Sequence, residues 1–178
     1  MTARVRVVLD ACVLLNLIAS GHPLGELGER NGLDFLVVAQ AEREVLWLDS
    51  EDPDRPREEV HLQQFLEIGH LTRLVLHDGE LDRFVQLAHV LDDGEAATLA
   101  VAELRGFVVA TDDRKALRVL TTLEPPPRAI GTAAILRAWA ADHNDAEIRV
   151  CLNRIQSKAS FLPPRSDPDR DWWQDHAK

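Results

Sequence analysis

Cysteine is scarce in this chain of 178 residues, which contains only Cys12 and Cys151. The two lie far apart in apolar surroundings, so the sequence predicts neither a disulfide framework nor a zinc site. Long hydrophobic runs are also lacking, and no window approaches the roughly 18–20 apolar residues of a membrane helix. The start of the chain has two arginines before an apolar run, but Asp10 interrupts that run. We therefore expect a cytoplasmic protein without a signal peptide.

Tyrosine is absent and there are only five phenylalanines, so no platform for stacking RNA bases is evident. Basic residues are in deficit, with 20 Lys and Arg against 30 Asp and Glu, and the net charge is −10. This balance argues against a broad basic face for duplex DNA. The excess acids could be a solvated surface, hold a cation or meet a basic partner. No G-x-G-x-x-G motif follows an apolar run, which disfavours a dinucleotide-binding fold.

Short apolar runs alternate with helical patterns along the chain, without repeats or a long linker. Strands are predicted at residues 5–9, 34–38, 74–76, 107–110 and 128–131. Helices are predicted at residues 11–20, 39–48, 59–69, 81–90, 95–105, 114–120, 132–142 and 146–157. An exposed loop is predicted at residues 49–58, and a tail without periodicity at 161–178, after a single domain at 1–160. The alternation indicates an α/β fold with a mainly parallel sheet of about four to five short strands.

Acidic residues follow two of the predicted strands. Asp10 ends the first strand, and Asp112 and Asp113 follow a later one. Because ligands of parallel sheets sit beyond the carboxyl ends of the strands, these acids are expected to meet at one edge. Glu95 opens the helix that leads into the later strand, and Glu44 lies on the predicted helix after the second strand. All of them can therefore converge on one pocket.

Converging carboxylates raise one another's pKa values, and a divalent cation relieves the repulsion. Oxygen ligands suit Mg²⁺ or Mn²⁺, which can activate a water and stabilise charge on a phosphate. Phosphodiester hydrolysis is the natural reaction of such a site. The alternative is that strand-end acids such as Asp10 only cap the next helix. Asp93 is better explained as a cap, Glu42 could replace Glu44, and one of Asp112 and Asp113 could cap while the other coordinates.

Four segments in this order resemble the PIN-domain family: LDACVLLNL at 9–17, EREVL at 42–46, GEAATLAVA at 94–102 and VVATDDRKAL at 108–117. The resemblance spans roughly residues 5–140. It implies a three-layer fold around a parallel sheet and an endoribonuclease that depends on Mg²⁺ or Mn²⁺. Many members are VapC-type toxins of toxin–antitoxin pairs, so it also implies a cognate antitoxin and a homodimer.

Carried over residue by residue, the resemblance makes Asp10, Glu44, Glu95 and Asp113 the four catalytic acids. Asp10, Glu95 and Asp113 would bind the metal, with Asp112 as an extra ligand. Thr111 resembles the hydroxyl residue that orients the fourth acid. The chain departs from the family at Cys12, where many members have Asn, and at its third acid, which is Glu where many have Asp.

Several further side chains have two interpretations. Arg114, Lys115 and Arg118 lie on the predicted helix beside Asp113 and could meet phosphates or neutralise nearby acids, with Arg43 a weaker candidate for a phosphate contact. Trp172 and Trp173 could anchor a partner, or fold back on the chain's own surface, which is the favoured interpretation. The other two tryptophans, Trp47 and Trp139, are expected on helix faces as core or dimer contacts.

Two other classes of protein compete with the nuclease interpretation. A PIN-like binding module without catalysis would explain Cys12 at the Asn position. A phosphoacceptor receiver domain also gathers acids at strand ends, but it needs paired acids after the first strand. Here Asp10 is followed by Ala11.

Overall fold

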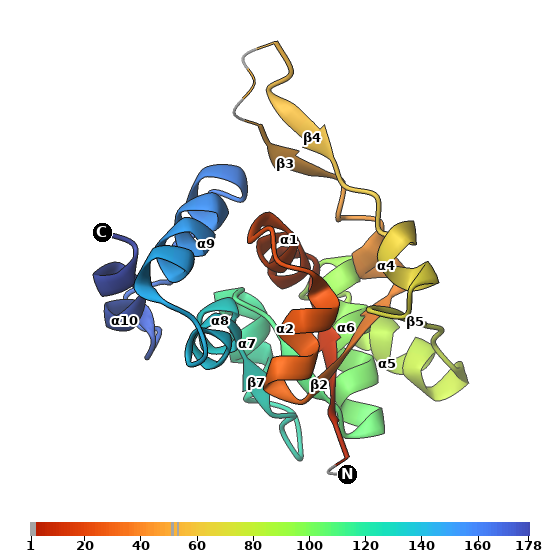
Figure 1. The fold of residues 1–178 in the computed structure, drawn as a ribbon. Helices are drawn as coiled ribbons and strands as arrows, with labels where there is room; N and C mark the ends of the chain where they lie inside the picture. The colour runs from red at the N-terminus through yellow and green to blue at the C-terminus, as the bar shows by residue number, and fades with distance from the viewer. Residues whose placement is uncertain (1–2, 51, 53) are drawn as a thin grey trace.

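The computed structural model describes residues 3–50, 52 and 54–178 (Figure 1). Its central sheet has five strands in the order β5-β2-β1-β6-β7, and every neighbouring pair is parallel. The strands are β1 (Val5–Leu9), β2 (Leu33–Val38), β5 (Thr72–Leu74), β6 (Val108–Ala110) and β7 (Ala129–Ile130). The predicted α/β class with a mainly parallel sheet of four to five short strands is confirmed.

Helices flank this sheet in two groups. Helix α6 (Asp93–Arg105) contacts β1, β2 and β6 and carries α3, α5 and α7 beside it, whereas α1, α2, α8 and α9 contact one another in the second group. Their bounds are α1 (Ala11–Ala19), α2 (Leu24–Asn31), α3 (Ala39–Glu42), α4 (Gln63–Glu67), α5 (Asp78–Leu87), α7 (Arg114–Leu120), α8 (Thr132–Ala140), α9 (Asp145–Lys158) and α10 (Arg170–His176). No helix in the described ranges is long and apolar enough to cross a membrane.

The elements beside the acids are largely buried. Val7, Val8 and Leu9 are fully buried, as expected for a central parallel strand covered on both faces. Helix α6 is rich in buried alanine, which lets it approach the sheet closely. It ends at Gly106, whose φ of 65° is left-handed and suits glycine. These elements fix the strand ends that carry the acids.

The predictions for residues 39–69 were wrong in detail. Helix α3 ends at Glu42, and the chain turns and forms β3 (Trp47–Asp49), which pairs antiparallel with β4 (Arg57–Glu59). The end of the predicted helix is therefore a strand of a hairpin, whereas the described residues between β3 and β4 are irregular and mostly exposed, as predicted, and α4 is much shorter than the helix expected there. The cause is long-range pairing of strands, which local periodicity cannot detect. Trp47 is 49% exposed on this hairpin and is not a core residue.

The C-terminal segment, predicted as a tail, packs on the rest of the chain through α10. Helix α10 contacts α8 and α9. Trp173 is fully buried and meets the ring of Phe161 edge-on, with 5.4 Å between ring centroids. Trp172 is partly buried, and Trp139 is fully buried in the core. Trp173 therefore folds back on the chain's own surface, which was the favoured interpretation.

Candidate metal-binding carboxylate site

Asp10 lies where the carboxyl ends of β1 and β6 meet. Its backbone N–H donates to the carbonyl of Ala110 at 2.9 Å, which joins the two strand ends. Its side chain is 3% exposed, and burial raises its pKa. One oxygen, Oδ1, accepts from the N–H of Ala11 at 2.8 Å and caps α1. The other, Oδ2, accepts from the hydroxyl of Thr111 at 2.8 Å. The capping interpretation is thus true of one oxygen of Asp10.

Thr111 connects Asp10 to Asp113. Its hydroxyl donates to Asp10 and accepts from the backbone N–H of Asp113 at 3.2 Å. Asp113 Oδ1 in turn accepts from the N–H groups of Lys115 and Ala116, at 2.6 and 2.9 Å, and caps α7. Asp113 Oδ2 receives no hydrogen bond from any described residue. Both strand-end acids therefore cap a helix with one oxygen, and the other oxygen of Asp10 accepts from the side chains of Thr111 and Cys12.

Glu95 lies in the first turn of α6. Burial raises its pKa, and the negative charges of Asp113 and Asp10 add to the effect, so that the pKa is about 7. Its Oε2 accepts a long hydrogen bond of 3.4 Å from the N–H of Asp92. The three carboxylates of Asp10, Glu95 and Asp113 therefore share one electrostatic site, although they come from three separate elements.

Glu44 reaches the same region from the turn after α3, not from the helix predicted there. Its Oε1 accepts from the N–H of Gly94 at 3.0 Å. A Cβ at Gly94 would lie 2.5–2.7 Å from the atoms of this carboxylate, so glycine makes the contact available. Burial raises the pKa of Glu44, as do the charges of Asp10 and of the acids at the start of α6. Glu44 thus lies against the first turn of the helix that carries Glu95.

The structure decides between the alternatives predicted for two neighbouring acids, Glu42 and Asp93. Glu42 makes two hydrogen bonds to the guanidinium of Arg73, at 2.5 and 2.6 Å, and so does not replace Glu44. Asp93, expected to cap α6, is instead its first residue, and Asp92 is the cap. The prediction for Asp93 was therefore wrong by one position.

Asp112 is held by the start of α8. Its Oδ1 accepts from the N–H of Thr132 at 3.0 Å, and its Oδ2 from the hydroxyl of Thr132 at 2.5 Å and the amide of Asn16 at 3.2 Å. Burial raises its pKa, and these hydrogen bonds oppose the shift. Asn16 and Thr132 were not singled out in the sequence. The available signal was an asparagine on the otherwise apolar helix ACVLLNLIA.

Cys12 occupies the first turn of α1 beside Asp10. Its thiol donates to Asp10 Oδ2 at 3.4 Å. Burial and the charge of Asp10 raise the pKa of the thiol, which is therefore neutral at physiological pH. A neutral thiol is a weak donor, so Cys12 supports Asp10 less strongly than an amide would.

Negative charge at this site is not balanced by basic side chains. Among the described residues, no Lys, Arg or His forms an ion pair with Asp10, Glu44, Glu95 or Asp113. In the same ranges, no group of three or more His, Cys, Asp or Glu side chains is arranged to hold a metal ion as the side chains lie. The donors are all oxygens and carry excess negative charge, which fits a hard divalent cation.

The basic residues of α7 lie next to this site. Arg114, Lys115 and Arg118 are exposed, and none of them pairs with an acid in the part of the chain that the structure describes. Arg118 donates from Nε to the carbonyl of Arg114 at 3.1 Å. A contact with a phosphate and longer-range neutralisation of the nearby acids both stay predictions for these three residues.

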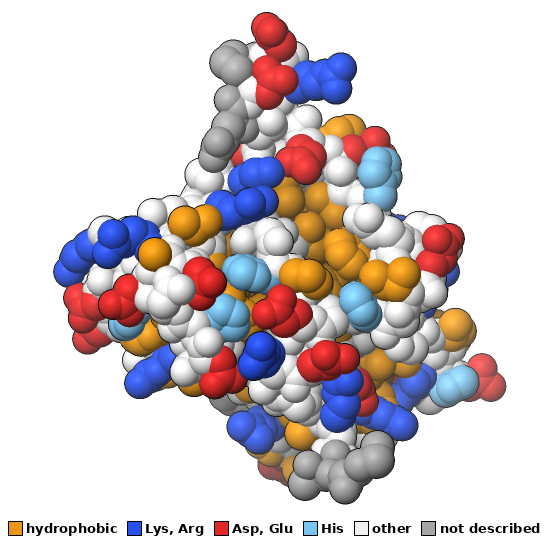
Figure 2. Space-filling model, in the orientation of Figure 1, with side chains coloured by type: hydrophobic (Ala, Val, Ile, Leu, Met, Phe, Trp, Pro, Cys, Tyr) orange, Lys and Arg blue, Asp and Glu red, His pale blue; other side chains and the backbone are white. Residues whose placement is uncertain are grey.

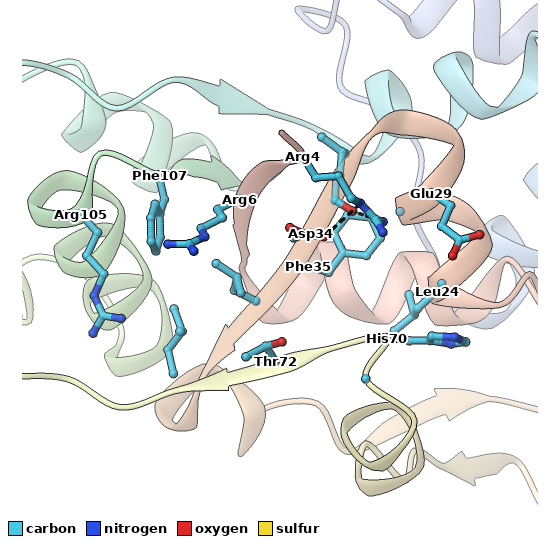
Figure 3. Close-up of a pocket in the computed structure, with 16 residues that line it drawn as sticks. Arg4, Arg6, Leu24, Glu29, Asp34, Phe35, His70, Thr72, Arg105 and Phe107 are labelled. Atoms are coloured by element: carbon cyan, nitrogen blue, oxygen red, sulfur yellow. Dashed lines mark hydrogen bonds and ion pairs between the residues drawn. The ribbon is translucent and has the colours of Figure 1, made fainter. Parts of the chain in front are cut away.

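A pocket of about 560 Å³ lies at the end of the sheet opposite to the carboxylate site (Figure 3). It opens among the amino ends of β1, β2 and β6. Arg4 pairs there with Asp34 at 3.0 Å, and the guanidinium of Arg6 lies 5.4 Å from the ring centroid of Phe107. The pocket is therefore separate from the carboxylate site, which belongs to the carboxyl ends of the same strands.

Comparison of the chain with protein-family models, with curated proteins and with solved structures found no match. Its function is therefore argued from the arrangement of its own residues.

Proposed function

We propose that this chain is a PIN-like endoribonuclease that depends on Mg²⁺ or Mn²⁺ and hydrolyses RNA phosphodiester bonds. The observation that carries the proposal is the hydroxyl of Thr111, which hydrogen-bonds both Asp10 and the backbone of Asp113. It ties two acids together at the carboxyl ends of neighbouring parallel strands, where ligands of such sheets bind. No described basic side chain offsets their charge, so a divalent cation is the expected counter-ion.

Each acid has a role in this proposal. Asp10, Glu95 and Asp113 would hold the ion, and Asp112, which accepts hydrogen bonds from Thr132 at the start of α8, would support the site. Glu44 completes the site or accepts the proton of the attacking water. When bound, the ion supplies a water of lowered pKa and stabilises the charge that develops on the phosphate. Thr111 fixes the positions of Asp10 and Asp113, and no protein nucleophile is required.

The biological setting of the proposal rests on the resemblance to PIN domains alone. The chain would act in the cytoplasm on RNA, as a homodimer and as the toxin of a toxin–antitoxin pair. The observation to make is whether a neighbouring gene encodes a small DNA-binding antitoxin. A chain without such a neighbour would keep the proposed chemistry and lose the toxin role.

The test of the chemistry is the substitution Asp10→Asn. Asparagine still caps a helix, so α1 and the fold are retained. One metal ligand loses its charge, and we expect Mn²⁺-dependent cleavage of defined RNAs to fall at least about a hundredfold, since removing one charged group of a catalytic site costs several kcal/mol. The matched control is Asp142→Asn, an exposed acid whose one ion pair among the described residues is with Arg30. Cleavage by Asp10→Asn at the wild-type rate would contradict the assignment of Asp10 as a catalytic metal ligand.

A binding module without catalysis is the second candidate, and Cys12 favours it because a thiol supports Asp10 only weakly. Titration with Mn²⁺ separates the two. A chain that neither binds Mn²⁺ nor cuts RNA at any metal concentration would be the binding module.

A further inference from the structure

A groove of about 480 Å³ leads away from the carboxylate site beneath the β3–β4 hairpin. Cys12 and Glu44 line one end of it. Trp47 and Arg57 of the hairpin line it, together with Lys158 and Phe161 from the end of α9 and the segment that follows. The groove therefore includes Glu44, one of the candidate catalytic acids, in its lining.

Trp47 presents its ring to solvent in this groove. It is 49% exposed and the neighbouring Leu46 is 51% exposed, whereas Trp139 and Trp173 are fully buried. Figure 1 shows the hairpin projecting from the body of the molecule. The register pairs Trp47 with Glu59 and Asp49 with Arg57. Trp47 and Asp49 are two residues apart on β3 and so share a face, and Arg57 lies directly opposite Asp49 on that face. Trp47 and Arg57 therefore point to the same side of the hairpin.

The hairpin is held over the groove by α9. Lys158 Nζ donates to Glu58 of β4 at 2.7 Å, and the hydroxyl of Ser160 lies 3.4 Å from Asp49 of β3. Arg57 is exposed and pairs with no described acid. Figure 2 shows basic side chains gathered where the end of α9 approaches the hairpin. The groove thus combines an exposed aromatic ring, Trp47, with the cation of Arg57, and the acids Glu44 and Asp49 also line it.

We propose that this groove binds single-stranded RNA, with one base stacked on Trp47 and a phosphate at Arg57, so that the strand leads past Cys12 and Glu44 to the acids. This inference rests on the proposed ribonuclease function and names its substrate as unpaired RNA. Channels for single strands combine a cationic path with aromatic rings on which bases stack, and stacking tolerates every base. A base within a duplex already stacks on its neighbours and cannot offer a face to Trp47. Lys158 acts as a positioning residue through Glu58.

The experiment measures binding without cleavage. A fluorescently labelled, mixed-sequence RNA of twelve nucleotides is titrated with the Asp10→Asn chain in EDTA, and its anisotropy is followed. We expect Trp47→Ala to weaken binding about tenfold or more, consistent with the loss of one stacked base. Trp47→Phe should restore most of the affinity. Arg57→Gln should weaken binding and lower the salt dependence by about one phosphate contact.

Matched controls lie outside the groove. Val75→Ala removes an apolar side chain that is 71% exposed after β5, and Arg149→Gln removes an exposed cation of α9. Both should bind as the parent does. Circular dichroism checks that each variant is folded. A duplex of the same sequence should compete poorly with the single strand.

Several outcomes would contradict the proposal that this groove binds RNA. It fails if Trp47→Ala and Arg57→Gln bind like the parent, if the parent binds no RNA, or if the duplex competes as well as the single strand. It also fails if only substitution of the basic residues of α7 removes binding. If wild-type RNA cleavage is unchanged by Trp47→Ala and Arg57→Gln, the nuclease stands and the groove fails. If Trp47→Ala weakens binding by a chain that never cuts RNA, the groove stands and the nuclease fails.

Discussion

Individual residues at this site serve the fold and the site at the same time. Asp10 and Asp113 each cap a helix with one carboxylate oxygen, while Thr111 connects them across two strands. Capping would therefore not prevent the proposed metal binding, because a carboxylate has two oxygens and each oxygen can accept from more than one partner.

The pH dependence of stability provides a test at Glu95, whose pKa is raised to about 7 in the folded chain from an ordinary 4.5. Between these pH values the folded state binds more protons than the unfolded state, so stability falls as pH rises through the window. Without metal, we expect the unfolding free energy of the wild type to fall by about 1–2 kcal/mol between pH 4.5 and 7.5 because of Glu95, after allowance for solvent screening. Glu95→Gln should lack this decrease. Urea denaturation in EDTA measures it.

Glu67→Gln is the control for that experiment, because Glu67 is exposed and its side chain accepts, within the described ranges, from Gln63 alone. It should keep the pH dependence of the wild type. An identical pH profile for wild type and Glu95→Gln would mean that neither burial nor the charges of Asp113 and Asp10 raise the pKa of Glu95 in the folded chain.

The sequence was sufficient to place the acids whose positions depend on the strand or helix that carries them. Asp10 and Asp113 follow continuous apolar strands, and Glu95 opens a helix rich in alanine, so their convergence could be predicted. The partners of Asp112 could not, because Asn16 and Thr132 come from elements 96 and 20 residues away and carry no motif of their own.

Secondary-structure elements differ in how far their own sequence defines them. Helices α6 and α7 and strands β1 and β6 were predicted close to their observed bounds, because periodicity, caps and buried runs are local signals. The stretch AQAEREVLWL looked helical throughout, yet only its first four residues form α3. The rest turns and pairs with β4, ten residues further along, and that partner is not visible in a local window.

The junction of α3 and α6 gives a prediction at the scale of elements. Gly94→Ala places a Cβ within 2.5 Å of the Glu44 carboxylate and should push this flexible side chain away from the start of α6. Alanine favours the helix by up to about 1 kcal/mol, which offsets the lost hydrogen bond, so stability should change little. RNA cleavage should fall at least about fivefold if Glu44 belongs to the site. Thermal unfolding and cleavage rates are measured together.

Gly79→Ala is the matched control, since Gly79 also lies in the first turn of a helix and a Cβ there meets nothing within 4 Å. It should leave cleavage unchanged. Full activity in Gly94→Ala would place Glu44 outside the reaction.

At the scale of the whole molecule, the net charge is −10, and the four candidate acids at one edge of the sheet add to it without a described basic partner. Mn²⁺ should raise the melting temperature, because a ligand that binds only the folded state stabilises it. The rise should be larger at pH 8 than at pH 5.5, since protons compete with the ion for Glu95, whose pKa is about 7. Differential scanning fluorimetry with and without EDTA measures it, with NaCl of equal ionic strength as the control.

A rise that is equal at both pH values, or that persists in Asp10→Asn, would assign the effect of Mn²⁺ to another surface. The pH difference distinguishes binding at these acids from a general response to salt.

Strand β1 lies in the middle of the sheet, yet its neighbour β6 comes far later in the chain, and Asp10 and Thr111 are 101 residues apart. The chain is synthesised from its N-terminus, so Asp10 emerges from the ribosome long before the residues that orient it. A nascent chain consequently carries the first acid without its hydroxyl partner. If the protein cuts RNA as proposed, translation delays that ability until most of the polypeptide has been made, and the ribosome that makes it is spared until then.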